Sequence, residues 1–188
     1  MIVIAARPGM GKTAFALNIA THAAMTTKKA IAIFNLEMSK EQLVNRMLSA
    51  LGGIEGKKLQ NGQMMQTDWK KYNEAMSQLA DTNMYIEDNA GITSSDIRAK
   101  CRRLASKPEG LGLVIIDYLQ LLTLGGKRPD SRQQEVSDIS RSIKTMAMEL
   151  KVPVIALAQL SRNAEKRENN EPMPVSYTHL TLPTTPYV

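Results

Sequence analysis

Cysteine, histidine and aromatic residues are scarce in this chain of 188 residues. There is one cysteine, Cys101, there are two histidines, and aromatic residues make up 4% of the sequence. A single cysteine excludes an internal disulfide and is typical of a reducing compartment. Cys101 falls within a predicted helix, where we expect a small buried side chain and not a reactive thiol. The scarcity of aromatic side chains argues against a surface that stacks the bases of single-stranded nucleic acid.

The sequence also lacks any apolar run of the roughly 18 residues that a membrane-spanning helix needs. Its apolar opening, Met1–Ala6, has no basic flank of the kind that signal peptides carry. We therefore expect a soluble, cytoplasmic protein with no membrane partner. The 24 Lys and Arg residues exceed the 18 Asp and Glu residues, and the net charge of +6 suits a polyanionic partner. If that partner is a nucleic acid, contacts to its phosphates should dominate.

Short apolar segments alternate with amphipathic segments along the chain. The predicted strands are 1–6, 30–34, 84–87, 113–117 and 152–158, and the predicted helices are 12–25, 40–51, 66–80, 93–107 and 133–150. We expect residues 54–65 to be irregular. Strands separated by helices form a parallel sheet with helices on both faces, so the sequence predicts one α/β domain.

Some details of these elements are specific enough to compare with a structure. The strand 1–6 has no polar face and should be fully buried. Trp69 should be a packing anchor within the helix 66–80. The basic side of the helix 93–107 favours a solvated face over a nucleic-acid contact. One side of the helix 12–25 carries Phe15, Ile19, His22 and Ala23.

The segment that joins the first strand to the first helix fits a phosphate-binding loop, with Ala where the first Gly normally stands. It consists of Ala6, Arg7, Pro8, Gly9, Met10, Gly11, Lys12 and Thr13. Such a loop presents free backbone N–H groups and a helix N-terminus to phosphates, and Gly11 allows the backbone to approach closely. Lys12 is placed to bind the β- and γ-phosphates, and the Thr13 hydroxyl is placed to coordinate Mg²⁺. The loop therefore predicts a nucleotide site; a plain glycine turn is the alternative.

Three polar residues follow later strands and should reach the same edge of the sheet. Asp117 ends the strand 113–117, where a carboxylate faces the ligand crevice of a parallel sheet, and capping of a turn is its alternative role. Glu37 follows the second strand, where it can deprotonate an attacking water or favour the dipole of the next helix. Gln159 closes the fifth strand, where an amide suits either a γ-phosphate or the backbone of a loop.

Four segments closely resemble the RecA-like motor domain of bacterial and phage replicative helicases of the DnaB type. These segments, which occur in the order of the family's motifs, are Ala5–Thr13, Phe34–Ser39, Val114–Leu122 and Val152–Arg162. The resemblance covers residues 1–174 and implies a RecA-like P-loop NTPase core with the fifth strand between the first and the fourth. It implies the following roles: Lys12 and Thr13 as the Walker A pair, Asp117 as the Walker B acid, Glu37 as the catalytic glutamate and Gln159 as the γ-phosphate sensor.

The same resemblance implies a hexameric helicase that uses ATP and Mg²⁺ to translocate on single-stranded DNA, with primase and a helicase loader as partners. The loop at 125–132 and the segment 161–174 match the family's DNA-facing loops. The candidate DNA contacts in these segments are Lys127, Arg128, Arg132 and Arg162. Two alternatives stay open: a recombinase-like ATPase without unwinding, and a nucleotide-binding fragment without turnover.

Residues 175–188 differ in composition from the rest of the chain. They contain no Asp, Glu, Lys or Arg, and Pro183 and Pro186 disfavour a central strand. The family's N-terminal helical domain, linker helix and arginine finger have no counterpart in this sequence. We expect residues 1–174 to form the ATPase domain, incomplete at both ends, and residues 175–188 to be a non-native or disordered tail.

Overall fold

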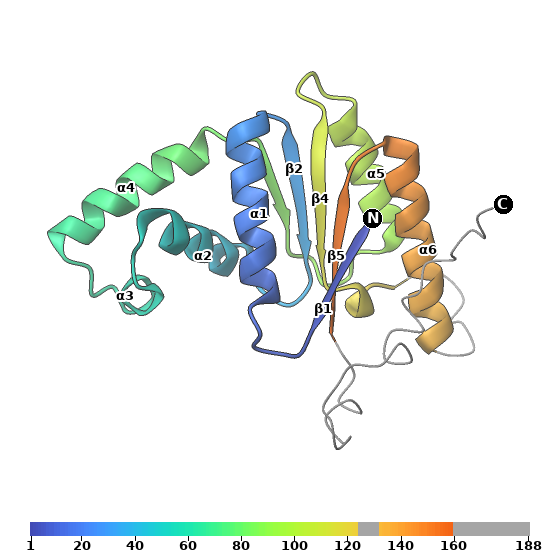
Figure 1. The fold of residues 1–188 in the computed structure, drawn as a ribbon, viewed down its shortest axis with the longest axis horizontal. Helices are drawn as coiled ribbons and strands as arrows, with labels where there is room; N and C mark the ends of the chain where they lie inside the picture. The colour runs from blue at the N-terminus through green and yellow to red at the C-terminus, as the bar shows by residue number, and fades with distance from the viewer. Residues whose placement is uncertain (124–131, 160–188) are drawn as a thin grey trace, which may run out of the picture.

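Five parallel strands form a single sheet in the order β1–β5–β4–β2–β3 (Figure 1). The computed structural model describes residues 1–123 and 132–159. The strands are β1 (Ile2–Ala6), β2 (Ala30–Asn35), β3 (Met84–Glu87), β4 (Leu111–Asp117) and β5 (Val154–Gln159). The predicted parallel sheet is confirmed, and β5 lies between β1 and β4 as the resemblance implied.

Helices cover both faces of the sheet, with α1 and α2 on one side and α5 and α6 on the other (Figure 1). They are α1 (Lys12–Thr27), α2 (Lys40–Gly52), α3 (Gly56–Asn61), α4 (Gln66–Ala80), α5 (Ser94–Ala105) and α6 (Arg132–Leu150). The prediction that residues 54–65 are irregular is wrong, because α3 lies within them. An ion pair of 2.9 Å between Lys58 Nζ and Asp68 Oδ2 joins α3 to α4, and such a tertiary contact cannot be read from local sequence.

Alternation along the buried strands divides the core into two layers. In β2, Ile31 and Ile33 pack with α1 and α2. The intervening Ala32 and the following Phe34 pack with α5 and α6 on the other face. This double burial explains the nearly continuous apolar sequence of the central strands. Each face of the sheet thus packs against its own layer of helices.

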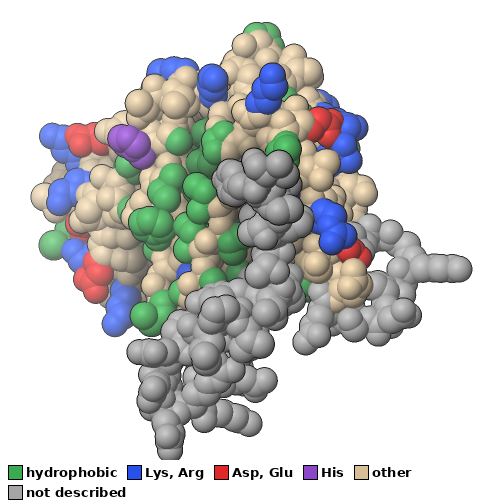
Figure 2. Space-filling model, turned by 45° about the vertical axis from the view of Figure 1, so that its right-hand side comes forward, with side chains coloured by type: hydrophobic (Ala, Val, Ile, Leu, Met, Phe, Trp, Pro, Cys, Tyr) green, Lys and Arg blue, Asp and Glu red, His purple; other side chains and the backbone are tan. Residues whose placement is uncertain are grey.

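The first strand differs from the sequence-based expectation. β1 is not fully buried: it pairs only with β5 among the described strands, and Ile2 is 57% exposed. The helix α1 packs through small residues that allow close approach to the sheet, namely Ala16, Ala20 and Ala24, together with Leu17 and Thr21. The side that carries Phe15 is only partly packed: Phe15 is 56% exposed, whereas Ile19 and Ala23 are partly buried against the core. Figure 2 shows hydrophobic side chains gathered in a band on one face of the molecule.

The remaining expectations about single elements have mixed outcomes. Trp69 is half exposed and contacts the Tyr72 ring edge-on, so it does not anchor a core. Cys101 is fully buried, and burial raises the pKa of its thiol to about 12, as expected for an inert side chain. On α5, Arg98 and Arg102 pair with Glu149 of α6, which agrees with a solvated structural face. Within residues 1–123 and 132–159, no helix has the length and apolar character needed to cross a membrane.

Candidate nucleotide-binding site

The loop after β1 has the backbone geometry that phosphate binding requires. Gly9 and Gly11 have φ values of 75° and 81°, in the left-handed region that glycine adopts without a steric penalty. Gly11 is the N-cap of α1, so the first turn of that helix and its free N–H groups follow the loop directly. Lys12 and Thr13 are the first two residues of the helix. The plain glycine turn is therefore the weaker interpretation, because the strand, the loop and the helix N-terminus all stand in the required order.

Thr13 and Asp117 meet at this helix N-terminus. The Thr13 hydroxyl donates a hydrogen bond of 2.6 Å to Asp117 Oδ2. Asp117 ends β4 and is 2% exposed. Its other oxygen, Oδ1, is buried and accepts no hydrogen bond from the described residues. A buried carboxylate oxygen without a donor is costly unless a cation or a water satisfies it.

These two side chains fit a magnesium ion. Mg²⁺ takes oxygen ligands and usually keeps several waters, so it needs only one or two protein groups. The Thr13 hydroxyl and the unsatisfied Asp117 Oδ1 supply such groups beside a phosphate loop. No cluster of three or more His, Cys, Asp or Glu side chains occurs in the part of the chain that the structure describes. The donor set therefore suits a nucleotide-bound Mg²⁺ better than an all-protein metal cage.

Asn35 joins Asp117 to the segment that carries Glu37. It ends β2 directly opposite Asp117 in the strand register and is 1% exposed. Its Nδ2 donates to Asp117 Oδ2 at 3.2 Å. Its Oδ1 accepts hydrogen bonds from the backbone N–H groups of Glu37, at 2.9 Å, and Met38, at 2.6 Å. One side chain thus holds the chain that leaves β2 against the end of β4.

Glu37 and Gln159 line a cavity of about 230 Å³ together with the phosphate loop. Glu37 precedes Ser39, the N-cap of α2, and the first turn of that helix already contains Glu41. This placement favours the cavity over the helix dipole as the environment of Glu37. Gln159 pairs with Ala6 in the strand register, and its backbone N–H and C=O bond to the side chain of Gln120. Gln159 thus lines the cavity, and Gln120 holds its backbone in place.

Two carboxylates act on Tyr118, which follows the end of β4. Burial raises the pKa of the Tyr118 hydroxyl, and the nearby carboxylates of Glu37 and Asp117 raise it further. The same negative charge favours a bound cation at the end of β4. Lys12 and Arg46 are the cationic side chains that line the cavity.

The structure brings together most of the site residues predicted from sequence. The eight loop residues, Glu37, Asp117 and Gln159 all lie at the carboxyl edge of the sheet. Arg132 is the first residue of α6. Three predicted DNA contacts, Lys127, Arg128 and Arg162, lie outside the described residues, as does the tail 175–188.

Three further residues belong to this site and were not predicted from the sequence. Asn35 and Gln120 hold the strand ends in place, and Arg46 reaches the cavity from α2. A polar residue at the end of an apolar strand was a usable signal for Asn35. For Arg46, nothing in the local sequence separates it from an ordinary exposed arginine on an amphipathic helix.

Comparison with known proteins agrees with this geometry. Residues 1–177 match the family model described as the DnaB-like helicase C terminal domain. The chain belongs to this family. It is 54% identical over 173 residues to the replicative DNA helicase DnaC of Bacillus subtilis and, over the same length, 54% identical to the replicative DNA helicase DnaB of Geobacillus stearothermophilus. Each match covers 92% of this chain and 38% of the relative, so the chain spans well under half of these helicases.

Solved structures of the family share the fold. A DnaB-like replicative helicase, described with its interactions with primase, superposes with a TM-score of 0.87 at 38% identity, covering 95% of this chain and 44% of that one. A second structure, described as an ATPase domain, also gives 0.87, at 39% identity and over 95% of this chain and 63% of that one. The RecA-like P-loop fold is therefore established, and the family match favours a helicase motor over the recombinase-like alternative.

Proposed function

We propose that residues 1–174 are the ATPase motor domain of a replicative DNA helicase, which binds ATP with Mg²⁺ and hydrolyses it to move along single-stranded DNA and unwind the duplex. The observation that carries the proposal is the contact between Thr13 and Asp117. It places a Walker A hydroxyl and a buried acid with an unsatisfied oxygen beside a phosphate loop. The family match supports the same conclusion.

Each cavity residue has a distinct role in this proposal. The N–H groups of the loop and the Lys12 ammonium bind the β- and γ-phosphates. Thr13 and Asp117 hold Mg²⁺, which supplies charge neutralisation at the phosphates when it is bound. Glu37 accepts a proton from the attacking water. The water oxygen bonds to the γ-phosphorus, the bond to the bridging oxygen breaks, and ADP and phosphate leave.

Gln159 is proposed as the contact that detects the γ-phosphate. Gln159 lies at the end of β5, next to β1 and its loop. Release of the γ-phosphate would therefore remove a contact from this end of β5. The residues that follow Gln159 lead into the segment 161–174, which includes the proposed DNA contact Arg162. Lys127, Arg128 and Arg132 are proposed as further contacts to DNA phosphates.

The partners of the whole protein are also proposals. We infer a cytoplasmic homohexamer on single-stranded DNA that works with a primase and a helicase loader. The relatives named as replicative helicases and the structure of a DnaB-like helicase described with primase support this inference. We propose further that residues 175–188 are not part of the domain. A chain that ends at residue 174 should then bind ATP as tightly as the full chain does.

Titration of a fluorescent ATP analogue tests the nucleotide site. Lys12→Ala should weaken ATP binding by about 10- to 150-fold, because a hydrogen bond to a charged group contributes about 1.5–3 kcal/mol. Lys70→Ala is the matched control, since Lys70 is an exposed lysine of α4 that does not line the cavity. Unchanged affinity in Lys12→Ala, or an equal loss in both variants, would remove the assignment of the phosphate loop.

A further inference from the structure

Two cavities of the domain share a wall. A groove of about 660 Å³ runs between α1, α2 and α3, and the phosphate cavity of about 230 Å³ lies beside it. Two residues line both of them, Met38 and Arg46. Arg46 is the charged residue of the two, so its guanidinium can extend into the phosphate cavity.

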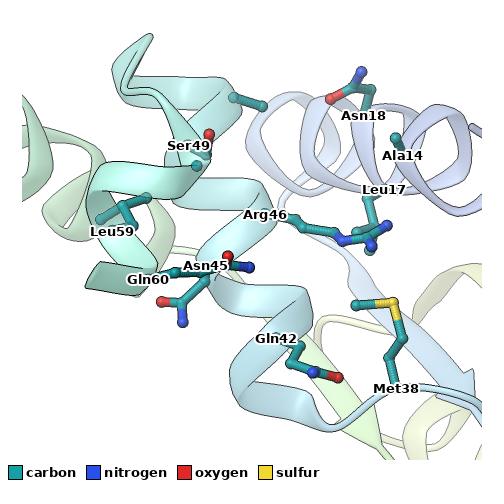
Figure 3. A pocket seen from close by; sticks show the side chains of 12 residues that line it. Ala14, Leu17, Asn18, Met38, Gln42, Asn45, Arg46, Ser49, Leu59 and Gln60 are labelled. Atoms are coloured by element: carbon teal, nitrogen blue, oxygen red, sulfur yellow. The ribbon is translucent and has the colours of Figure 1, made fainter. Parts of the chain in front are cut away.

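The rotation of α2 fixes the position of Arg46. Leu43 and Met47 pack into the core between α1 and the sheet. The neighbouring stripe of α2, with helical spacing, faces the groove and consists of Gln42, Asn45, Arg46 and Ser49. Figure 3 shows the side chain of Arg46 reaching from α2 toward Leu17 of α1, above Met38. The guanidinium therefore points along the wall and not away from the domain.

Arg46 has no anion to bind within the described part of the domain. Two other polar side chains of the stripe have local partners: Gln42 Oε1 accepts from the Ser39 backbone, and Ser49 Oγ donates to the Ile54 carbonyl at 2.6 Å. Among residues 1–123 and 132–159, no carboxylate or carbonyl binds the guanidinium of Arg46. By contrast, Arg98 and Arg102 are both paired with Glu149. An unpaired guanidinium beside a phosphate loop has its whole set of donors free.

We propose that Arg46 binds the terminal phosphate of the nucleotide, as a second cation besides Lys12. The inference rests on the proposed function, since it requires ATP in this cavity. Glu37 and Met38 lead directly into α2, and both line the phosphate cavity together with Arg46, so Arg46 and Glu37 share one wall of the cavity. The γ-phosphate must lie near this wall if Glu37 activates the attacking water. A guanidinium suits this position, because its planar fork can bind two phosphate oxygens at once.

The test compares the binding of fluorescent ATP and ADP analogues to the full 188-residue chain in the presence of Mg²⁺. Arg46→Ala should weaken ATP binding about tenfold and ADP binding much less, because the lost contact is made to the γ-phosphate. Arg46→Lys should fall between Arg46→Ala and the unaltered chain, since an ammonium keeps the charge and loses the fork. Arg103→Ala is the control: Arg103 is an exposed arginine of α5 that does not line this cavity.

Melting temperatures without nucleotide should be the same for all these chains, which separates a lost ligand contact from a loss of folding. The proposal for Arg46 alone would be overturned if Arg46→Ala bound ATP as tightly as the unaltered chain while Lys12→Ala remained impaired. An equal loss of ATP and ADP affinity would overturn the assignment to the terminal phosphate. Absence of ATP binding by the unaltered chain would overturn the proposed function, and the role of Arg46 with it.

Discussion

The Thr13 hydroxyl donates a hydrogen bond of 2.6 Å to Asp117 Oδ2, across 104 positions of the sequence. This contact joins the start of α1 to the end of β4 and fixes the direction of the Asp117 carboxylate. The second oxygen of Asp117 is left buried and unsatisfied among the described residues. Asp117 Oδ1 is thus free to bind a cation, while Asp117 Oδ2 is held by Thr13.

Asp117→Asn should abolish the dependence of ATP binding on Mg²⁺. The amide keeps the shape of the carboxylate but removes the charge that attracts the cation. ATP titrations with Mg²⁺ and with EDTA measure the effect: the unaltered chain should bind more tightly with Mg²⁺, and the variant should bind equally in both. Thr13→Ser, which keeps the hydroxyl, should retain the dependence. A full Mg²⁺ effect in Asp117→Asn would argue against this site.

Asn35→Leu should lower the free energy of unfolding by about 1–3 kcal/mol. The change removes the acceptor of two partly buried hydrogen bonds from the backbone N–H groups of Glu37 and Met38, and each such bond contributes about 0.5–1.5 kcal/mol. Urea denaturation measures the loss. Asn73→Leu, at an exposed position of α4, should change the stability little. If both variants unfold at the same urea concentration as the unaltered chain, Asn35 does not hold the Glu37 segment.

Glu37→Gln should leave ATP binding intact and reduce turnover by about 10²- to 10⁴-fold, the usual contribution of a general base. The chain spans 38% of its helicase relatives. Turnover is therefore best measured in a chimera in which residues 1–173 replace the matching segment of Geobacillus stearothermophilus DnaB. The same chimera without the substitution is the reference. Normal turnover in the variant chimera would return Glu37 to a role at the dipole of α2.

Ile143→Ala should destabilise the domain by about 2–5 kcal/mol, the range for removal of a large aliphatic side chain from a core. Ile143 is fully buried between α6 and the sheet. Met148→Ala on the same helix is the matched control, because Met148 is 67% exposed. The difference between the two urea midpoints tests the orientation of α6. Similar losses in both variants would mean that a different side of α6 faces the sheet.

Glu149→Gln should make the stability less sensitive to acid. Hydrogen bonds from Arg102, and then from Arg98, hold the pKa of Glu149 below its ordinary value. A carboxylate with a lowered folded-state pKa stabilises the fold above its unfolded pKa, and this contribution is lost as the pH falls through the folded pKa. The melting temperature of Glu149→Gln should thus lie slightly below that of the unaltered chain at neutral pH. The two should converge once the pH falls below the lowered pKa of Glu149.

The effect of Glu149 should also shrink in concentrated salt, since both arginines and the carboxylate are partly exposed and therefore screened. Melting curves at low and high NaCl provide this check. A gap that persists unchanged at acidic pH and in high salt would show that Glu149 acts through packing and not through its charge.

The sequence alone determined the features that depend on local order. The phosphate loop was readable because strand, glycines, lysine and helix must follow one another directly. Asp117, Glu37 and Gln159 were predictable because each lies at or just past the end of a strand, and the carboxyl ends of parallel strands meet at one edge. The covering of both faces of the sheet by helices was predictable because the central strands are apolar and have no polar face. The capping box of Ser39 and Gln42 at the start of α2 also depends only on neighbouring residues.

Only the tertiary structure decided which surfaces of these elements meet. The small residues of α1 pack on the sheet and Phe15 does not, because close approach of a helix depends on the shape of the opposing strands. β1 is partly exposed because the described sheet ends there, which no property of Met1–Ala6 reveals. Asn35 and Arg46 acquire their positions from the strand register and from the rotation of α2. Such contacts join residues far apart in the chain, so their energies depend on packing geometry that composition and periodicity do not contain.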